Sequence, residues 1–276
     1  MSALTESATT EEAAQFAATV AGIAARHSQG DPWTPGAAVS DADPALDEAL
    51  GEAGWHELGH DGGLLPLAAP AGAALGRAFA TLAPVDSLLG GALKVGPLAR
   101  YAKPGSATAE PRSGVILAGV AEEATEASYT DALGVGGVTV RGERAMARDE
   151  AETRMAAWVA ASTGYLAGLS EEALRLAVEH ARSRRAFGGP LSALAPVQQM
   201  LADAATLADG LTLLTGESPG IDALAHAGDA SERAVAICMQ VTGALGFTME
   251  FPLQRAYRRS RSARSWNDAV LAAWDR

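Results

Sequence analysis

The chain lacks the features that mark several large protein classes. It has one cysteine, Cys238, in 276 residues, which excludes an internal disulfide and fits a reducing compartment. No stretch reaches the roughly 18 consecutive apolar residues that a membrane-spanning helix needs. The N-terminal sequence, MSALTESATTEE, has no basic segment followed by an apolar core, so we expect no secretion signal. These absences favour a globular protein of the cytoplasm.

Aromatic and basic residues are also scarce. Aromatics make up 5% of the chain, and 21 Lys and Arg stand against 33 Asp and Glu, giving a net charge of −12. This charge argues against nonspecific nucleic-acid binding. Residues 1–150 hold 9 basic and 20 acidic side chains, which leaves 12 and 13 for the rest. With 48% apolar residues, many of them alanine, the chain can bury a core in which helices pack closely through small side chains.

Apolar periodicity predicts that most of the chain is helical. The predicted helices cover residues 10–26, 43–53, 71–82, 85–101, 151–184, 196–215, 221–245 and 252–275. Two β-like runs lie at 115–120 and 135–140. The last four helices are joined by short connections, which is typical of an antiparallel bundle. We therefore expect a mainly α fold with an N-terminal helical domain (1–108), a reduced β segment (109–150) and a four-helix bundle (151–276).

Two segments on the predicted bundle resemble the acyl-CoA dehydrogenase family. The first reads Arg184-x-x-Phe187-Gly188-x-Pro190, with Val197-Gln198 and Leu201-Ala202-Asp203 downstream. The second runs from Gln240 to Arg255 and reads QVTGALGFTMEFPLQR, where the family has Q-x-x-G-G-x-G-[FY]-x-x-E-x-P-[LV]. The resemblance covers residues 149–266 well and 49–93 loosely. Two matched segments, in order and on helices, are a strong signal.

The resemblance implies that the bundle cradles the adenine and pyrophosphate of an FAD held by a neighbouring subunit. Arg184 would pair with the pyrophosphate, and Phe187 would pack on the cofactor. Gln240 and Gly243 would contact it through side chain and backbone. Ala244 stands where the family has a second glycine, and its methyl group would hinder close approach of the backbone.

The resemblance also implies a catalytic position that this chain fills differently. In the family, a Glu removes the proton α to a thioester carbonyl while hydride leaves for the flavin. The commonest Glu position falls on Asn267 here, and the alternative position falls on Trp158. Neither side chain can accept that proton, and Asp268 becomes a candidate only if the alignment slips by one residue. The short middle segment matches none of the family's flavin-contacting strands, so one wall of the flavin pocket is expected to be missing.

A competing motif lies near the N-terminus. His56-Glu57-Leu58-Gly59-His60 spells the H-E-x-x-H pattern of zinc proteases, in which two His bind zinc and the Glu activates water. Pro66 occupies the place of a third ligand, and the surrounding glycines favour no stable helix. We therefore do not expect a metal site.

Three hypotheses remain beside that of an ordinary flavoenzyme. The first is a subunit of a heteromeric, FAD-dependent acyl-CoA dehydrogenase, resembling the base-lacking subunit of two-gene, steroid-catabolic enzymes, with FAD shared and a partner that supplies the Glu. The second is a flavin-independent enzyme on the same scaffold, acting on a CoA- or carrier-linked substrate through Asp268, Glu152 or His180. The third is a scaffold protein without chemistry.

Overall fold

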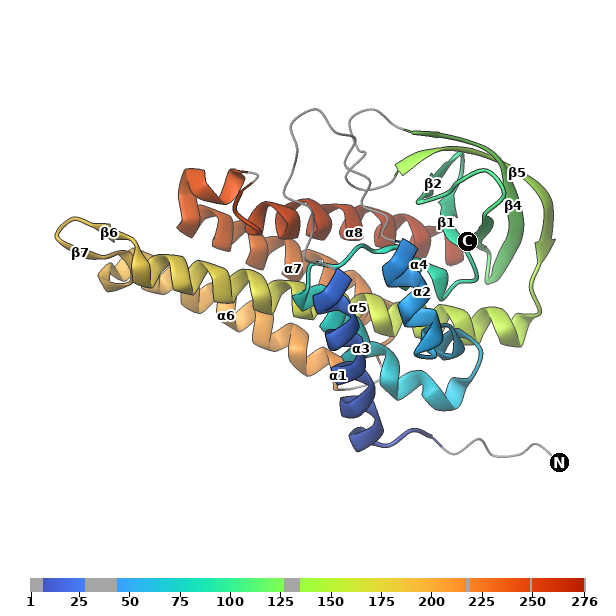
Figure 1. Cartoon of the computed structure of the whole chain (residues 1–276), viewed down its shortest axis with the longest axis horizontal. Coiled ribbons are helices and arrows are strands. Elements are labelled where there is room, and N and C mark those ends of the chain that lie inside the picture. Colours follow the sequence, from blue (N-terminus) through green and yellow to red (C-terminus); the bar gives the residue numbers. More distant parts are fainter. Residues whose placement is uncertain (1–6, 28–43, 127–134, 217–218, 249, 276) are drawn as a thin grey trace.

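The computed structural model describes residues 7–27, 44–126, 135–216, 219–248 and 250–275. Figure 1 shows short N-terminal helices, a small β-barrel at one end, and long helices that run from the barrel to the opposite end. The N-terminal helices are α1 (Thr10–His27), α2 (Pro44–Glu52), α3 (Leu65–Arg77) and α4 (Ala83–Ser87), with two 3₁₀ turns, η1 (Trp55–Gly59) and η2 (Gly62–Leu64), between α2 and α3. No helix in these described ranges is long and apolar enough to cross a membrane.

A reciprocal capping box begins α1. The backbone N–H of Glu12 donates to the Thr9 hydroxyl over 3.2 Å, and the Glu12 carboxylate accepts from the Thr9 backbone N–H over 2.7 Å. These bonds satisfy donors that the first helical turn leaves unpaired. The sequence places the helix correctly to within one residue, but the cap is Thr9 rather than Thr10.

Five strands close into a barrel. They are β1 (Ala92–Val95), β2 (Leu98–Arg100), β3 (Ala107–Arg112), β4 (Val115–Glu126) and β5 (Val135–Ala145). The strand order is β1-β2-β5-β4-β3, and only the β1–β3 pair, which closes the barrel, is parallel.

The predicted helix at 85–101 is therefore wrong: α4 ends at Ser87, and β1, its turn and β2 occupy residues 92–100. Gly90 and Gly96 have φ of 103° and 59°, values that break a helix, and Gly96-Pro97 forms the two-residue turn between the strands. The predicted boundary at residue 108 falls inside β3. The β segment thus begins earlier and closes more completely than the expected reduced segment at 109–150.

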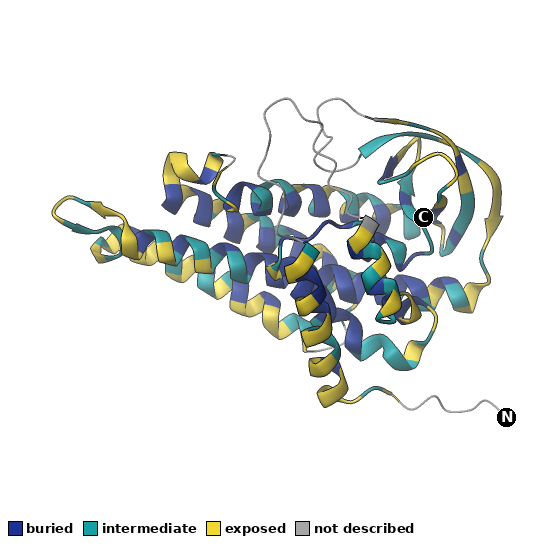
Figure 2. Cartoon of the chain, in the orientation of Figure 1, coloured by how far each residue is buried: buried dark blue, intermediate teal, exposed yellow. Residues whose placement is uncertain are grey.

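Four long helices form the rest of the molecule. They are α5 (Arg148–Ser183), α6 (Ala195–Thr215), α7 (Ile221–Thr242) and α8 (Leu253–Trp274), all within three residues of the predicted bounds. Consecutive helices run antiparallel, and α5 packs against the other three. Burial along α5 is nearly continuous where it crosses the N-terminal helices and decreases toward its C-terminal end (Figure 2).

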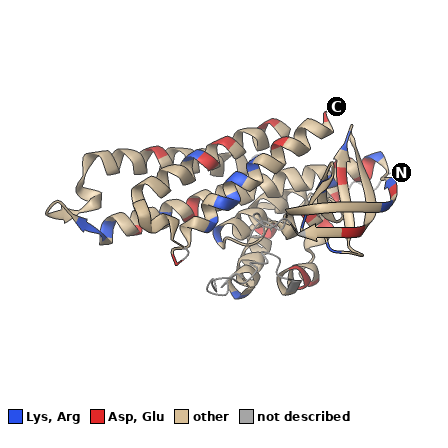
Figure 3. Ribbon diagram, turned by 90° about the horizontal axis from the view of Figure 1, so that it is seen from above, with Lys and Arg blue, Asp and Glu red and all other residues tan. Residues whose placement is uncertain are grey.

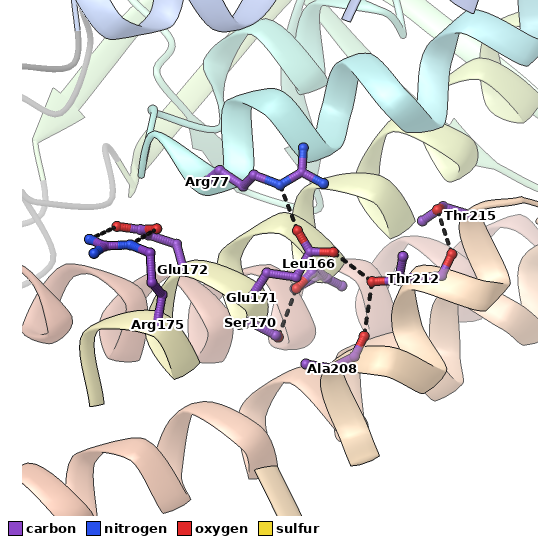
Figure 4. Close-up of polar contacts among 9 residues, drawn as sticks. All are labelled: Arg77, Leu166, Ser170, Glu171, Glu172, Arg175, Ala208, Thr212 and Thr215. Carbon is purple, nitrogen blue, oxygen red and sulfur yellow. Dashed lines mark hydrogen bonds and ion pairs between the residues drawn. The ribbon is translucent and has the colours of Figure 1, made fainter. Parts of the chain in front are cut away.

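Polar side chains connect the helices on the outside. The Arg77 guanidinium at the end of α3 donates to Glu171 of α5 over 2.5 Å, and Glu171 also accepts from the Thr212 hydroxyl of α6 over 2.7 Å (Figure 4). Figure 3 shows basic and acidic residues interspersed along the long helices. Arg264 of α8, for example, pairs with Glu232 of α7 over 2.7 Å. Arg261 and Arg264 of α8 therefore both form cross-helix pairs with Glu232 of α7.

Glycines bring the backbones of α3 and α5 into direct contact. Each helix carries two glycines four residues apart, and a Cβ added at any of the four would overlap a carbonyl oxygen of the other helix. The overlapping pairs are Gly72 with Ala161, Gly76 with Tyr165, Gly164 with Ala69, and Gly168 with Ala73. The expected close packing through small side chains is most pronounced here.

We predict that Gly164→Ala lowers the free energy of unfolding by about 3 kcal/mol, because the added methyl group must push the two helices apart. Denaturant unfolding followed by circular dichroism measures the change. Gly210→Ala is the matched control: Gly210 is exposed on α6, and its added Cβ would meet nothing within 4 Å. It should raise stability by about 0.5–1 kcal/mol. Equal effects of the two substitutions would contradict this account of the contact.

Cys238 is expected to be chemically inert in the folded protein. Its side chain is fully buried in α7, and burial raises the pKa of the thiol to about 12. Because the thiolate is the reactive form, a disulfide reagent at pH 8 should label the native chain no faster than the chain unfolds. Rapid labelling of native protein, compared with protein in denaturant, would show that this part of α7 opens.

Candidate functional site

The antiparallel bundle brings two predicted site segments to the same end of the molecule. The C-terminal end of α5 continues into a hairpin of β6 (Arg185–Ala186) and β7 (Gly189–Pro190), and the C-terminal end of α7 continues into the 3₁₀ turn η5 (Gly243–Phe247). Figure 1 shows both at the end opposite the barrel. Arg184, Phe187, Gln240, Gly243 and Ala244 therefore all lie at this end, which we call the open end.

The hairpin presents Phe187 to solvent. The Arg184 N–H donates to the His180 carbonyl over 2.8 Å, and the Arg184 carbonyl accepts from Leu191 N–H over 2.8 Å, so the base of the hairpin is fixed. At its tip, Phe187 has φ of 52° and is 91% exposed. A bulky residue in the left-handed region costs about 1–2 kcal/mol, and its ring gains nothing from burial here. Such a feature is typical of a contact with another molecule.

The second segment at the open end depends on a glycine. The Gly243 N–H donates to the Gln240 carbonyl as α7 ends, and Gly243 has φ of 60° and ψ of −141°, which only glycine adopts without strain. Gln240 and Ala244 are exposed, and so is Phe247 of the same turn.

An aromatic contact joins the two segments. The His180 ring at the end of α5 meets the Phe251 ring edge-on, with centroids 6.3 Å apart. Partial burial, together with the nearby charge of Arg184, lowers the pKa of His180. In the described part of the chain, Arg184 itself has no ion-pair partner. An exposed cation, an exposed ring and a bare backbone turn fit an anionic, flat ligand presented from outside. The role of these residues in cofactor binding stays a prediction.

At the other end, the two predicted base positions are closed off. Trp158 is fully buried, and Asn267 is 2% exposed. Asp268 is on the surface, with a side chain 55% exposed and 3.8 Å from Arg264, and Glu152 is ion-paired with Arg148 over 2.8 Å at a similarly exposed position. None of these residues presents a buried carboxylate of the kind a general base requires.

The junction between barrel and bundle instead contains a buried ion pair that the sequence analysis missed. Nη2 of Arg100 in β2 lies 2.5 Å from Oδ1 of Asp86 in α4, and each side chain is 1% exposed. Trp158 Nε1 donates to the same oxygen over 3.4 Å, and the Arg100 guanidinium lies 5.1 Å from the centre of the Trp266 ring. Burial raises the pKa of the Asp86 carboxyl, and the charge of Arg100 opposes that shift. One signal was available: Asp86 is the only carboxylate between Gly62 and Thr108.

Both histidines of the H-E-x-x-H motif have other polar neighbours. His56 Nδ1 lies 3.4 Å from the Ser87 hydroxyl, and the His60 ring lies 3.1 Å from Nη2 of Arg154. A guanidinium beside His60 is unfavourable for a metal cation. Across the described ranges, no group of three or more His, Cys, Asp and Glu could hold a metal ion.

We predict that Arg100→Met lowers the free energy of unfolding by about 3–5 kcal/mol, because it leaves the Asp86 charge buried and uncompensated. Adding Asp86→Leu should recover most of that loss, since an apolar pair of similar volume needs no partner. Arg148→Ala, which breaks an exposed pair, is the control and should leave the unfolding midpoint unchanged. Additive losses in the double variant would mean that the two charges are not coupled.

Comparison with known proteins supports the family resemblance over part of the sequence. Residues 143–218 match the family model described as the C-terminal domain of acyl-CoA dehydrogenase. The pig (Sus scrofa) short-chain specific acyl-CoA dehydrogenase of mitochondria is 39% identical over 111 residues, which cover 34% of this chain and 26% of that protein. The sequence match thus spans about a quarter of the curated relative's length.

Solved structures match over nearly the whole chain. The ChsE4–ChsE5 complex from Mycobacterium tuberculosis gives a TM-score of 0.71 at 18% identity, covering 96% of each chain. The steroid ACAD Tcur3481–Tcur3483 gives 0.68 at 15% identity with the same coverage. The chain therefore has an acyl-CoA dehydrogenase-like fold, and its residues 143–218 are similar to the C-terminal domain of that family.

Proposed function

We propose that this chain is one subunit of a hetero-oligomeric, FAD-dependent acyl-CoA dehydrogenase. It contributes the cradle for a cofactor whose reactive ring is held by the partner, and it does not supply the catalytic base. The observation that carries the proposal is the contrast between the two ends of the bundle: Arg184 and Phe187 are exposed, whereas Trp158 and Asn267 are buried.

The chemistry of the open end supports a cofactor presented from outside. A guanidinium forms paired hydrogen bonds with phosphate oxygens, so Arg184 suits a pyrophosphate. The Phe187 ring offers a flat apolar face, and the Gly243 turn lets a ligand approach the backbone closely. The family that residues 143–218 resemble uses FAD, whose adenylate half has these properties.

The absence of a Glu at the family's two base positions supports the existence of a partner subunit. Dehydrogenation of an acyl-CoA removes a proton from the carbon next to the thioester and a hydride from the following carbon, so a carboxylate must face the first carbon. Asn267 and Trp158 cannot accept the proton, and the partner would supply this Glu together with most contacts to acyl-CoA. Two of the similar structures are named as pairs of proteins, which favours a two-chain enzyme, and one is a steroid enzyme, which favours a steroid-derived thioester.

The flavin-independent alternative has less support. It would rely on Asp268, Glu152 or His180 as acid–base groups. Asp268 and Glu152 are exposed and lie beside arginines. His180 packs against Phe251 at the open end, whereas Glu152 lies near the other end of α5. No observation brings a pair of these groups to one cavity. If no partner protein gives a complex that contains flavin, the hypothesis of a scaffold protein without chemistry is favoured.

We predict that the chain purified alone is colourless, and that co-expression with a dehydrogenase-like protein encoded beside it yields a yellow complex. The absorption spectrum and the mass of the complex in solution test this. A lone chain that retains FAD and oxidises an acyl-CoA would refute the proposal. A stable complex without flavin would favour the scaffold.

Within that complex, we predict that Arg184→Gln and Phe187→Ala each increase the dissociation constant for FAD by about tenfold, the loss expected for one charge-assisted or stacking contact. Flavin fluorescence on dilution measures the release. Arg182→Gln, an exposed change in the preceding helical turn, controls for charge alone, and Asp268→Asn should leave turnover unchanged. A complex in which Asp268→Asn abolishes turnover would place the base in this chain.

A further inference from the structure

The buried Asp86–Arg100 pair leaves much of its hydrogen-bonding capacity unused. Both donors that reach Asp86, Nη2 of Arg100 and Nε1 of Trp158, approach the same oxygen, Oδ1. Within the described part of the chain, Oδ2 of Asp86 and both Nε and Nη1 of Arg100 are buried without a hydrogen-bond partner. Buried polar groups are nearly always satisfied, so this pair does not fill the site on its own.

The walls of the site are suited to a small planar anion. The Arg100 guanidinium has one free edge and lies over the Trp266 ring, which favours a cation at that point. Trp158 is fully buried and aims its N–H at the carboxylate. A guanidinium fork matches the geometry of a carboxylate, and a single positive charge in a buried site balances one negative charge rather than two.

We propose that Arg100, Trp158 and Trp266 form a receptor for a small carboxylate, and that Asp86 is the chain's own carboxylate, bound in that receptor. The proposal assigns the remaining hydrogen bonds of Oδ2, Nε and Nη1 to ordered water. The receptor lies at the barrel end and involves neither the open end nor a partner, so it is independent of the proposed function.

The proposal makes a prediction about size. Asp86→Ala removes one carboxylate group and leaves Arg100 buried and unpaired, next to a space of the same size. Formate has the dimensions of the missing group, acetate adds one methyl group, and propanoate adds two carbons. The ions should therefore stabilise the variant in the order formate, acetate, propanoate, because each added carbon must displace Trp158 or its neighbours.

The experiment compares thermal unfolding of the full chain in sodium formate and in sodium chloride of equal ionic strength at pH 7. For Asp86→Ala, formate at about five times its dissociation constant should raise Tm by about 2–4 °C over chloride. Wild-type protein, whose receptor already holds the Asp86 carboxylate, should show no difference between the salts. The double variant D86A/R100M lacks the guanidinium and should show none either.

Two further measurements keep the test decisive. If Asp86→Ala does not accumulate in folded form, its refolding yield from denaturant in formate and in chloride replaces Tm, and Asp86→Ser is measured in parallel. Equal results in the two salts for both variants would overturn the proposal. A formate effect that persists in D86A/R100M, or that is equally large in the wild type, would also overturn it, since neither would involve the receptor.

Discussion

The ion pair between Asp86 and Arg100 holds together the parts on which the rest of the structure depends. Asp86 belongs to the last short N-terminal helix and Arg100 to the barrel, while the tryptophans beside them belong to the first and last helices of the bundle. Removing two charges from water is expensive, and only a well-placed partner offsets that cost. The pair therefore allows one docking of the barrel on the helices and penalises others, in which either charge would be buried alone.

The two ends of the bundle differ in what they make available to other molecules. At the barrel end, the aromatic and charged groups contact one another, and Asn267 of α8 is buried as well. At the open end, the side chains of Arg184 and Phe187 face solvent, and the backbone at Gly243 is bare. The same four helices thus separate a closed junction from an exposed surface.

Sequence patterns predicted the long helices well and the barrel poorly. Periodicity over some 20 residues or more, as in α5 and α8, averages out local ambiguity. The strands β1 and β2 are four and three residues long, and an alanine- and leucine-rich run of that length has no period to distinguish strand from helix. Gly90 and Gly96 were the residues that indicated turns in place of a continuous helix. Asp86 and Arg100, 14 residues apart, could not be paired while that segment was interpreted as one helix.

The glycine contact between α3 and α5 has a consequence for how the chain is made. Gly72 packs on Ala161, and the whole barrel lies between them in the sequence. On the ribosome, α3 emerges well before α5, the helix that covers it. The alanine-rich face of α3 stays uncovered while roughly 90 further residues are synthesised, which takes several seconds at ordinary rates of translation. Closing so large a loop is entropically costly, so prior closure of the barrel would shorten the search by bringing the two helices within reach.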